Sequence, residues 1–371
     1  MRILYDHQAF TGKKFGGVAR YFYGLMRTFR NQNIEAYSSV LFSNNQYIQS
    51  DKDFQVTPIP TLGNERLSNL LFSQINRVVS GLHILGRQYD VFHATFFHPY
   101  FLPIIGNKPL VLTYHDLIKE KFGEKYAHVD HIGTESKKKL LNRASAIIAV
   151  SHCTKNDLVE IYQVNPEKIT VVYHATNFGK IAPSPDFIIQ TPKHYFLYVG
   201  ARNDYKNFPL FLEAFQKVHT KYPEIQLICA GGGMFSKAEK EEMNRLKIQN
   251  FVYFYDINDE ILYRLYQNAI AFVYPSLYEG FGIPILEAFA CQCPVLLSNA
   301  SCFPEVAQQA ALYFEPDSSI SMANQMERVY QEEALRQQLI QNGTKRAQDF
   351  SPEKVAKETM AVYQKVVAGK K

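Results

Sequence analysis

The chain has 371 residues, of which 46% are hydrophobic and 20% are charged. This length suits two domains of ordinary size, and the composition excludes a chain that is mainly disordered. The longest apolar runs are far shorter than the ~20 residues that span a bilayer, and no apolar stretch typical of a secretory signal follows Met1. We therefore expect neither a membrane-spanning helix nor a leader peptide.

The cysteines indicate the redox compartment of the protein, and the charge indicates what kind of partner it can bind. The five cysteines are odd in number and form no C-x-x-C pair, which favours reduced thiols in a cytoplasm over disulfides or a zinc site. The net charge is +5, and residues 1–185 carry 21 Lys and Arg against 14 Asp and Glu. A basic first half can face anionic lipid, a phosphorylated acceptor or nucleic acid.

Apolar runs that read as strands alternate with segments that read as helices along the whole chain. This alternation is typical of parallel sheets built from βα units. The first half contains a helix at 17–30 and another that begins after Ser151, whose hydroxyl can cap its first turn. The strands predicted there are 2–5, 36–42, 91–94, 110–114, 146–150 and 169–173.

The pattern lapses and then restarts, so we predict two domains. Residues 181–194 form a proline-containing linker between a first domain, 1–180, and a second domain, 195–350, and a last helix follows at 351–371. The second half is predicted to contain strands 195–199, 225–230, 251–255, 269–274, 294–298 and 311–314, with helices 209–222, 237–248, 259–268, 284–290, 318–341 and 352–367. The fold class is therefore α/β with two doubly wound, Rossmann-like domains, whose ligands bind at the carboxyl ends of the strands.

The segment 274–287 is the most informative part of the sequence. A strand ends there, a loop with Gly280 and Gly282 follows, and Pro284 suits the first turn of a helix. Such glycines let backbone N–H groups approach a ligand, and a carboxylate at Glu287 can accept both hydroxyls of a ribose. A capping carboxylate and a tight turn explain any one of these residues, but not the whole string.

Two cations, Arg202 and Lys206, lie just past a predicted strand end, in the loop that opens a helix. A guanidinium and an ammonium at this place can hold a diphosphate and neutralise the charge that develops as a sugar leaves. The alternative is two exposed cations on an ordinary loop.

The string 279–287 resembles the E-x7-E signature of family 4 retaining glycosyltransferases of the GT-B type. Other segments of the sequence also resemble this family, namely Asp259-Glu-Ile-Leu and residues 294–306. Residues 199–207 look like the phosphate loop of that family. The resemblance is dense from about residue 195 to 315 and thinner in the first half. It implies a GT-B fold, in which two domains face a central cleft and the last helix crosses back to the first domain.

The resemblance implies a role for particular residues of this sequence. In the second domain Arg202 and Lys206 would hold the diphosphate, Glu279 the sugar and Glu287 the ribose. The residues implied in catalysis are His115, Arg202, Lys206 and Glu279. The residues implied in donor binding are Gly16, Gly17, Gly231, Ile257, Gly280, Phe281, Gly282, Ile283 and Glu287.

The first domain offers histidines after its strands. The resemblance places His115 near the donor sugar or the reacting centre, and a loop histidine bonded to backbone is the alternative. His93 and His98 are candidate acceptor contacts, with ordinary packing as the competing interpretation. His174 and Ala175 stand where many family members have an Asn-Gly turn, which leaves the conformation of this turn open.

The predicted function is a metal-independent, retaining hexosyltransferase. The resemblance implies a nucleoside diphosphate sugar as donor, GDP- or UDP-linked and of mannose or glucose type, and a glycan or lipid-linked acceptor in polysaccharide, lipopolysaccharide or capsule assembly. We expect no cofactor, no metal and no nucleic acid partner, and a peripheral place on the inner face of a membrane. Asp51-Lys-Asp53 imitates a metal-binding DxD motif, but we predict a solvated loop there.

Other functions fit the same architecture. A nucleotide-sugar epimerase or a phosphorylase would use a similar donor site, and a non-catalytic carbohydrate-binding protein would retain only part of it. A glycoside hydrolase would instead use two facing carboxylates and would need no nucleotide.

Overall fold

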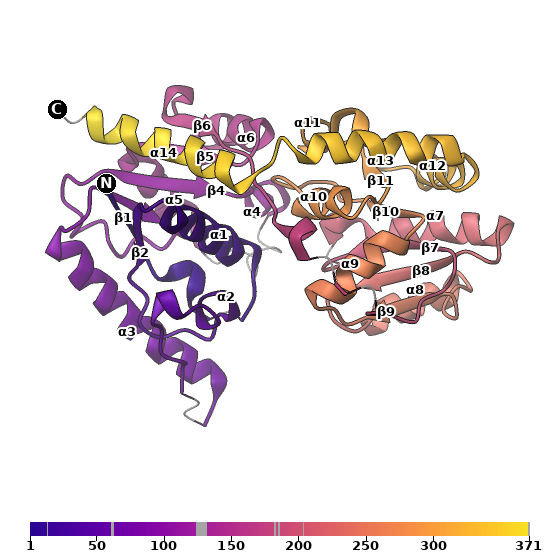
Figure 1. Ribbon diagram of the computed structural model, residues 1–371, viewed down its shortest axis with the longest axis horizontal. Helices are drawn as coiled ribbons and strands as arrows, with labels where there is room; N and C mark the ends of the chain where they lie inside the picture. Colours follow the sequence, from indigo (N-terminus) through magenta and orange to yellow (C-terminus); the bar gives the residue numbers. More distant parts are fainter. Residues whose placement is uncertain are drawn as a thin grey trace. The chain divides into compact units, whose positions relative to one another are not determined.

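The computed structural model describes residues 1–369 except 13, 61–62, 124–131, 182, 185 and 203. The chain forms two compact units, one made of Met1–His174 with Pro352–Lys371 and the other of Ala175–Ser351 (Figure 1). Each unit is built on one six-stranded sheet in which every neighbouring pair of strands is parallel. The predicted α/β class with two doubly wound domains is confirmed.

The first sheet has the strand order β2-β1-β3-β4-β5-β6. Its strands are β1 (Arg2–Tyr5), β2 (Glu35–Ser38), β3 (Val91–Ala94), β4 (Leu110–Tyr114), β5 (Ala146–Ala149) and β6 (Ile169–Val171). Its helices are α1 (Gly17–Asn31), α2 (Gln46–Gln49), α3 (Glu65–Gly86), α4 (Ile118–Phe122), α5 (Thr134–Arg143), α6 (His152–Tyr162) and α14 (Pro352–Ala368). Strands β3, β4 and β5 are buried along their whole length, which is why their sequences are almost entirely apolar.

The second sheet has the order β12-β11-β10-β7-β8-β9. Its strands are β7 (Tyr195–Val199), β8 (Gln226–Ala230), β9 (Val252–Tyr255), β10 (Ala271–Tyr274), β11 (Val295–Ser298) and β12 (Leu312–Phe314). Its helices are α7 (Phe208–Lys221), α8 (Lys237–Arg245), α9 (Asp259–Asn268), α10 (Ile283–Ala290), α11 (Phe303–Ala307), α12 (Ser319–Gln331) and α13 (Glu333–Ala347).

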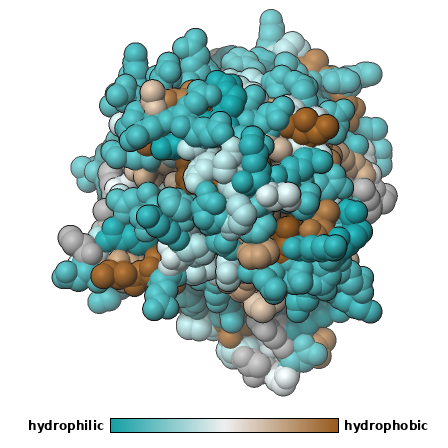
Figure 2. Space-filling model, turned by 90° about the vertical axis from the view of Figure 1, so that its right-hand side faces the viewer, coloured by the Kyte–Doolittle hydropathy of each residue, from teal (hydrophilic) through white to brown (hydrophobic). Residues whose placement is uncertain are grey.

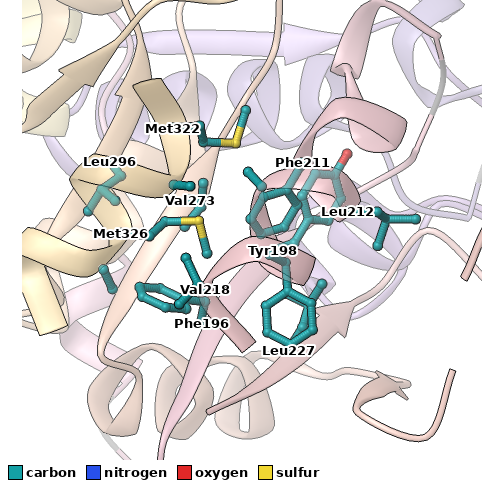
Figure 3. Close-up of a cluster of buried hydrophobic side chains, with 14 of the residues drawn as sticks. Phe196, Tyr198, Phe211, Leu212, Val218, Leu227, Val273, Leu296, Met322 and Met326 are labelled. Atoms are coloured by element: carbon teal, nitrogen blue, oxygen red, sulfur yellow. The ribbon is translucent and has the colours of Figure 1, made fainter. Parts of the chain in front are cut away.

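The core of the second unit lies between this sheet and the helices α7 and α12. Side chains from β7, β8, β10 and β11 contact side chains from the two helices there, and nearly all of them are fully buried. Figure 3 shows these side chains, among them Phe196, Tyr198, Phe211, Leu212, Val218, Leu227, Val273, Leu296, Met322 and Met326.

The last helix, α14, belongs to the first unit although it follows the second unit in the sequence. Figure 1 shows it in yellow along the first unit, where it contacts α1. The Tyr363 hydroxyl lies 2.6 Å from Nδ1 of His93 in β3 and 2.8 Å from the hydroxyl of Tyr5 in β1. Buried hydrogen bonds therefore fasten the end of the chain to the first sheet.

One helix cap and one helix boundary can be compared with the sequence predictions. Ser151 caps α6 as predicted, because its hydroxyl accepts a hydrogen bond from the amide of Thr154. The predicted single helix 318–341 is wrong in one respect. The helix is interrupted at Glu332, which has non-helical dihedral angles and separates α12 from α13. The Arg336 guanidinium donates to the carbonyls of Val329 and Tyr330, so a side chain from α13 satisfies the end of α12.

The strand predicted over 36–42 is shorter in the structure and ends at Ser38. The amides of Leu41 and Phe42 donate to Oδ1 of Asn76, at 3.1 and 2.9 Å, instead of pairing with β1. Asn76 belongs to α3, a 22-residue helix that the sequence pattern did not single out. A tertiary contact of one amide side chain thus ends the strand.

The surface drawn in Figure 2 is mainly hydrophilic, with hydrophobic residues in small separate patches. Among the helices that the structure describes, none is long and apolar enough to cross a membrane.

Candidate functional site

The order of the second sheet defines where a ligand is expected. From β7 the chain continues outward to β8 and β9, whereas β10, β11 and β12 occupy the opposite side of β7. The neighbours β7 and β10 therefore form the switch point of the sheet, where ligands of doubly wound folds bind beyond the carboxyl ends of the strands. The predicted residues Lys206 and Glu279 follow β7 and β10, respectively.

Lys206 and Glu279 form an ion pair across this switch point. The ammonium Nζ contacts Oε1 of Glu279 and lies 3.2 Å from the hydroxyl of Tyr274. It also lies 5.1 Å from the ring centres of Tyr205 and Tyr274, on whose faces a cation is attracted. The two charged side chains are only 13% and 11% exposed. A cation and an acid are thus held in fixed positions and largely shielded from water, at the place expected for a ligand.

The loop after β10 leads into α10 through Gly282. This residue has φ +92°, a left-handed conformation, and a Cβ atom there would lie 3.0 Å from Ile285 and 3.1 Å from Phe303. Only glycine fits without strain. Gly282 is also the N-cap of α10 and brings no side chain to the first helical amides. Ile283 is the first residue of that helix, so backbone N–H groups begin here that can face a ligand.

The other predicted residues of this loop are buried. Phe281 is 3% exposed and packs edge-on against Phe350, and Gly280 is buried beside it. Glu287 lies in the second turn of α10, is 5% exposed, and its Oε2 accepts a hydrogen bond of 3.4 Å from the Tyr266 hydroxyl. The Glu287 carboxylate is therefore anchored by a buried phenol.

Arg202 is placed differently from the prediction. Its Nε lies 2.5 Å from the Glu239 carboxylate, and its two terminal nitrogens donate to the carbonyls of Gly231, Gly233 and Met234 at 3.1, 2.7 and 3.2 Å. The side chain is 3% exposed. All three guanidinium nitrogens are thus bonded inside the chain, and this structure does not support the predicted diphosphate contact of Arg202.

The partner of Arg202 is the turn after β8. Gly231, Gly232 and Gly233 all have positive φ, between 71° and 81°. A Cβ atom at Gly232 would lie 2.3 Å from the carbonyl oxygen of Gly200, which follows β7. Only a glycine therefore fits at this position of the turn. A Cβ atom at Gly231 would lie 3.1 Å from the Ile257 side chain, so the turns after β8 and β9 lie against each other.

In the first unit His115 follows β4 and stacks on His174, with Nδ1 and Nε2 of the two rings 3.3 Å apart. The ring of Tyr21 packs against both histidine rings in T-shaped contacts. Burial lowers the pKa of His115 to about 4, so the ring is neutral at pH 7. Its Nε2 is buried and has no hydrogen-bond partner among the described residues, and a neutral ring nitrogen of this kind can bind a hydroxyl.

The two candidate acceptor histidines differ. His93 is fully buried in β3, and its ring nitrogens bond to Tyr363 and to Thr113, the latter at 2.9 Å. The acceptor contact predicted for His93 is therefore wrong: this ring holds α14 on the sheet. His98 lies in the loop after β3, where its amide donates to Gln8 at 2.9 Å.

Gly16 and Gly17 open α1. The backbone of Gly16 is extended, with φ 173°, which any residue adopts. A Cβ atom at either glycine would meet no atom of the described residues within 4 Å. Packing within the part of the chain that the structure describes therefore does not require these two glycines.

A polar cluster at the switch point between β1 and β3 was missed by the sequence analysis. The fully buried Asp6 accepts hydrogen bonds from Thr95 and from Gln8, the latter at 2.5 Å. The adjacent His7 is also buried, and its Nε2 has no partner among the described residues. The signal was present, because Asp6-His7-Gln8 follows a strand directly, as His115 does.

The described part of the chain contains no group of three or more His, Cys, Asp or Glu side chains arranged to hold a metal ion. Asp51 and Asp53, the imitation of a metal-binding motif, both pair with Arg27, at 3.2 and 2.8 Å.

Two family models match this chain. Residues 184–346 match the glycosyl transferases group 1, and residues 15–179 match glycosyltransferase family 4. The two matches cover both halves of the chain. The chain belongs to the family 4 glycosyltransferases.

Curated relatives of this glycosyltransferase include two O-antigen enzymes. It is 33% identical over 193 residues to the O-antigen chain mannosyltransferase RfbU of Salmonella typhimurium, and 29% identical over 243 residues to the O-antigen chain mannosyltransferase B of Escherichia coli. These matches cover 52% and 60% of this chain, and 52% and 61% of the relatives. The glycosyltransferase thus matches little more than half the length of these relatives.

Solved structures show the GT-B fold of this glycosyltransferase. HepE from Anabaena, in complex with UDP and glucose, superposes with a TM-score of 0.77 at 18% identity, over 98% of this chain and all of that one. Sucrose-phosphate synthase from Thermosynechococcus elongatus gives 0.76 at 20% identity over both whole chains. WaaG, a glycosyltransferase of lipopolysaccharide biosynthesis, gives 0.69 at 15% identity, over 97% and 98%.

Proposed function

We propose that this glycosyltransferase moves a hexose from a nucleoside diphosphate sugar to a hydroxyl of a glycan or lipid-linked acceptor and retains the anomeric configuration. The observation that carries the proposal is the Lys206–Glu279 pair at the β7/β10 switch point, beside the glycine turn into α10. The donor belongs to the GDP- or UDP-sugars, and the sugar is of mannose or glucose type. The names of the two O-antigen relatives favour mannose.

Lys206 is the proposed contact to the diphosphate. Its ammonium is fixed by Glu279 and Tyr274 before any ligand arrives, so a phosphate oxygen can take up one of its donors without reordering a flexible side chain. As the bond between the sugar and the phosphate breaks, negative charge grows on the leaving diphosphate, and a shielded cation stabilises it strongly. Glu279 then serves as an acceptor for a sugar hydroxyl, as well as the partner of Lys206.

Glu287 is proposed to bind the ribose, and the amides that begin at Ile283 are proposed to face the diphosphate or the sugar. Arg202 is a positioning residue in this proposal. It holds the Gly231–Gly233 turn by its carbonyls, and this turn adjoins Ile257, where the base is proposed to lie.

The proposed chemical step takes place on one face of the sugar. The bond from the anomeric carbon to the phosphate oxygen breaks, the acceptor oxygen bonds to the same carbon, and the acceptor proton passes to the departing phosphate. Gly16, Gly17 and His115 are the proposed contributions of the first unit. The step requires no metal ion, because Lys206 supplies the positive charge.

Product analysis tests this proposal. The full chain is incubated with GDP-mannose or UDP-glucose and with a lipid-linked oligosaccharide extract, in the presence of EDTA, and the new linkage is examined by NMR. The proposal predicts transfer from one of these donors with an α product from an α donor. An inverted product, free epimerised donor, or activity that EDTA abolishes would contradict it.

A further inference from the structure

Helix α3 exposes an apolar stripe to solvent. Leu67, Leu71, Val78, Leu82 and Leu85 are 61%, 49%, 65%, 63% and 54% exposed. At 100° per residue these five side chains fall within an arc of about 60° and extend over about 27 Å of the helix. Figure 1 shows α3 in purple, as a long helix on an outer side of the first unit.

Hydrogen bonds on the opposite face hold the helix in this orientation. Asn76 accepts from two amides and donates to the carbonyl of Phe42 and to Thr11, at 2.7 and 3.1 Å. One turn later, the Ser80 hydroxyl lies 2.6 Å from the hydroxyls of both Ser39 and Tyr100. Rotating α3 to bury its leucines would leave these buried polar groups without partners, at a cost of ~1–3 kcal/mol each.

The charges beside the stripe are basic. Arg66 at the start of α3 and Arg87 at its carboxyl end are exposed, and the only acid in the segment is Glu65, its first residue. Arg77 instead packs inward, with its guanidinium carbon 5.8 Å from the ring centre of Tyr100. Pairing with a second copy of α3 would bring like charges together in either direction. The stripe also offers only on the order of 500 Å², less than the ~800 Å² per partner that a standard protein interface buries. An anionic bilayer matches both the leucines and the arginines.

We propose that α3 lies in the surface of an anionic lipid bilayer, parallel to it, with the leucine stripe among the acyl chains and the exposed Arg66 and Arg87 at the phosphates. This inference rests on the proposed function only for its purpose: a lipid-linked acceptor would be met at the surface where its lipid is anchored. Binding to the bilayer itself requires neither donor nor acceptor.

Vesicle sedimentation tests the proposal without any substrate. The full chain is mixed with vesicles of phosphatidylcholine, alone or with phosphatidylglycerol, and the bound fraction is measured. We expect binding to the anionic vesicles and a loss of at least about tenfold in partitioning for Leu71→Gln with Leu82→Gln. Arg66→Gln should weaken binding about fivefold, and only on anionic vesicles.

A matched control uses Ile188 and Ile320, which are 85% and 63% exposed in the second unit. Ile188→Gln with Ile320→Gln should bind like the unchanged chain, and thermal melts confirm that each variant is folded. Equal binding by the leucine variant, or no vesicle binding at all, overturns the proposal. Analytical centrifugation tests the alternative occupant. If the unchanged chain is a dimer and the leucine variant is a monomer, a second copy covers the stripe and the proposal is overturned. If the unchanged chain binds vesicles but transfers no sugar, only the proposed function is contradicted.

Discussion

At the scale of single residues, the site depends on how two cations are held. Lys206 pairs with one acid at the place where a ligand is expected, whereas Arg202 is enclosed by three carbonyls and an acid. These four contacts use four of the five N–H donors of the Arg202 guanidinium, so at most one donor is left for a ligand. The two residues should therefore respond differently to substitution.

Lys206→Ala should lower kcat by roughly 10²–10³, because the growing charge on the leaving diphosphate loses its cation. Lys237→Ala is the matched control, since Lys237 is a lysine of the same unit that is 92% exposed. Steady-state kinetics measure the effect. Similar rates for Lys206→Ala and for the control would refute the assignment.

Arg202→Ala should act mainly on stability. It leaves the Glu239 carboxylate and the carbonyls of the glycine turn without their donor, which we expect to lower the free energy of unfolding by about 2–4 kcal/mol. Urea denaturation measures this loss. A variant as stable as the unchanged chain, with a donor KM raised tenfold or more, would mean that Arg202 contacts the donor after all.

At the scale of elements, the hydrogen bonds of one tyrosine add to the packing that holds α14 on the first unit. Tyr363→Phe removes the hydroxyl that contacts both Tyr5 and His93 and leaves their buried polar groups unsatisfied. We expect the first unit to lose about 1–3 kcal/mol of stability. Calorimetry of the full chain measures this. A transition of the first unit that does not shift would show that packing alone holds α14.

The sequence predicts most elements because nearly all of them bury an apolar face. Helix α3 is the exception: its buried positions include Ser68, Asn76 and Ser80, and its leucines face outward. No periodicity of apolar residues can assign the buried face of such a helix. The shortened β2 has the same origin, because Asn76 takes the amides that would continue the strand.

The candidate site was predictable where the signal is local. Glu279, Gly282 and Lys206 follow strand ends, and their positions could be read from the sequence. The bonding of Arg202 could not, because its partner Glu239 lies 37 residues later. The spacing of Ser236 and Glu239 does indicate a capping box, which is present, but not which cation the glutamate also meets.

At the scale of the whole molecule, the stability of the first unit should depend on pH. Burial lowers the pKa of His7 and His93 to about 3, that of His115 to about 4, and that of His174 well below its usual value. Below pH ~6.5 the unfolded chain binds protons that the folded unit does not, at about 1.4 kcal/mol per pH unit for each histidine. Burial also raises the pKa of Asp6, so the folded unit can hold one proton that the unfolded chain releases. This single proton only partly offsets the protons that the unfolded histidines bind.

Stability is therefore complete above pH ~6.5 and falls as the pH drops towards 4. Calorimetry between pH 4 and pH 8 should show the transition of the first unit moving to lower temperature, with net proton uptake on unfolding. A transition temperature that stays constant over this range would contradict the burial of these rings as neutral groups.

Calorimetric titration with nucleoside diphosphates tests the central claim most directly, namely that the β7/β10 switch point holds a nucleotide sugar by its diphosphate. GDP and UDP are titrated into the full chain, Lys206→Ala and Lys237→Ala, each with EDTA. The account predicts that one of the two nucleotides binds to the full chain and to Lys237→Ala, and binds at least about tenfold more weakly to Lys206→Ala. Absence of binding heat with both nucleotides, or equal affinity in all three proteins, would contradict it.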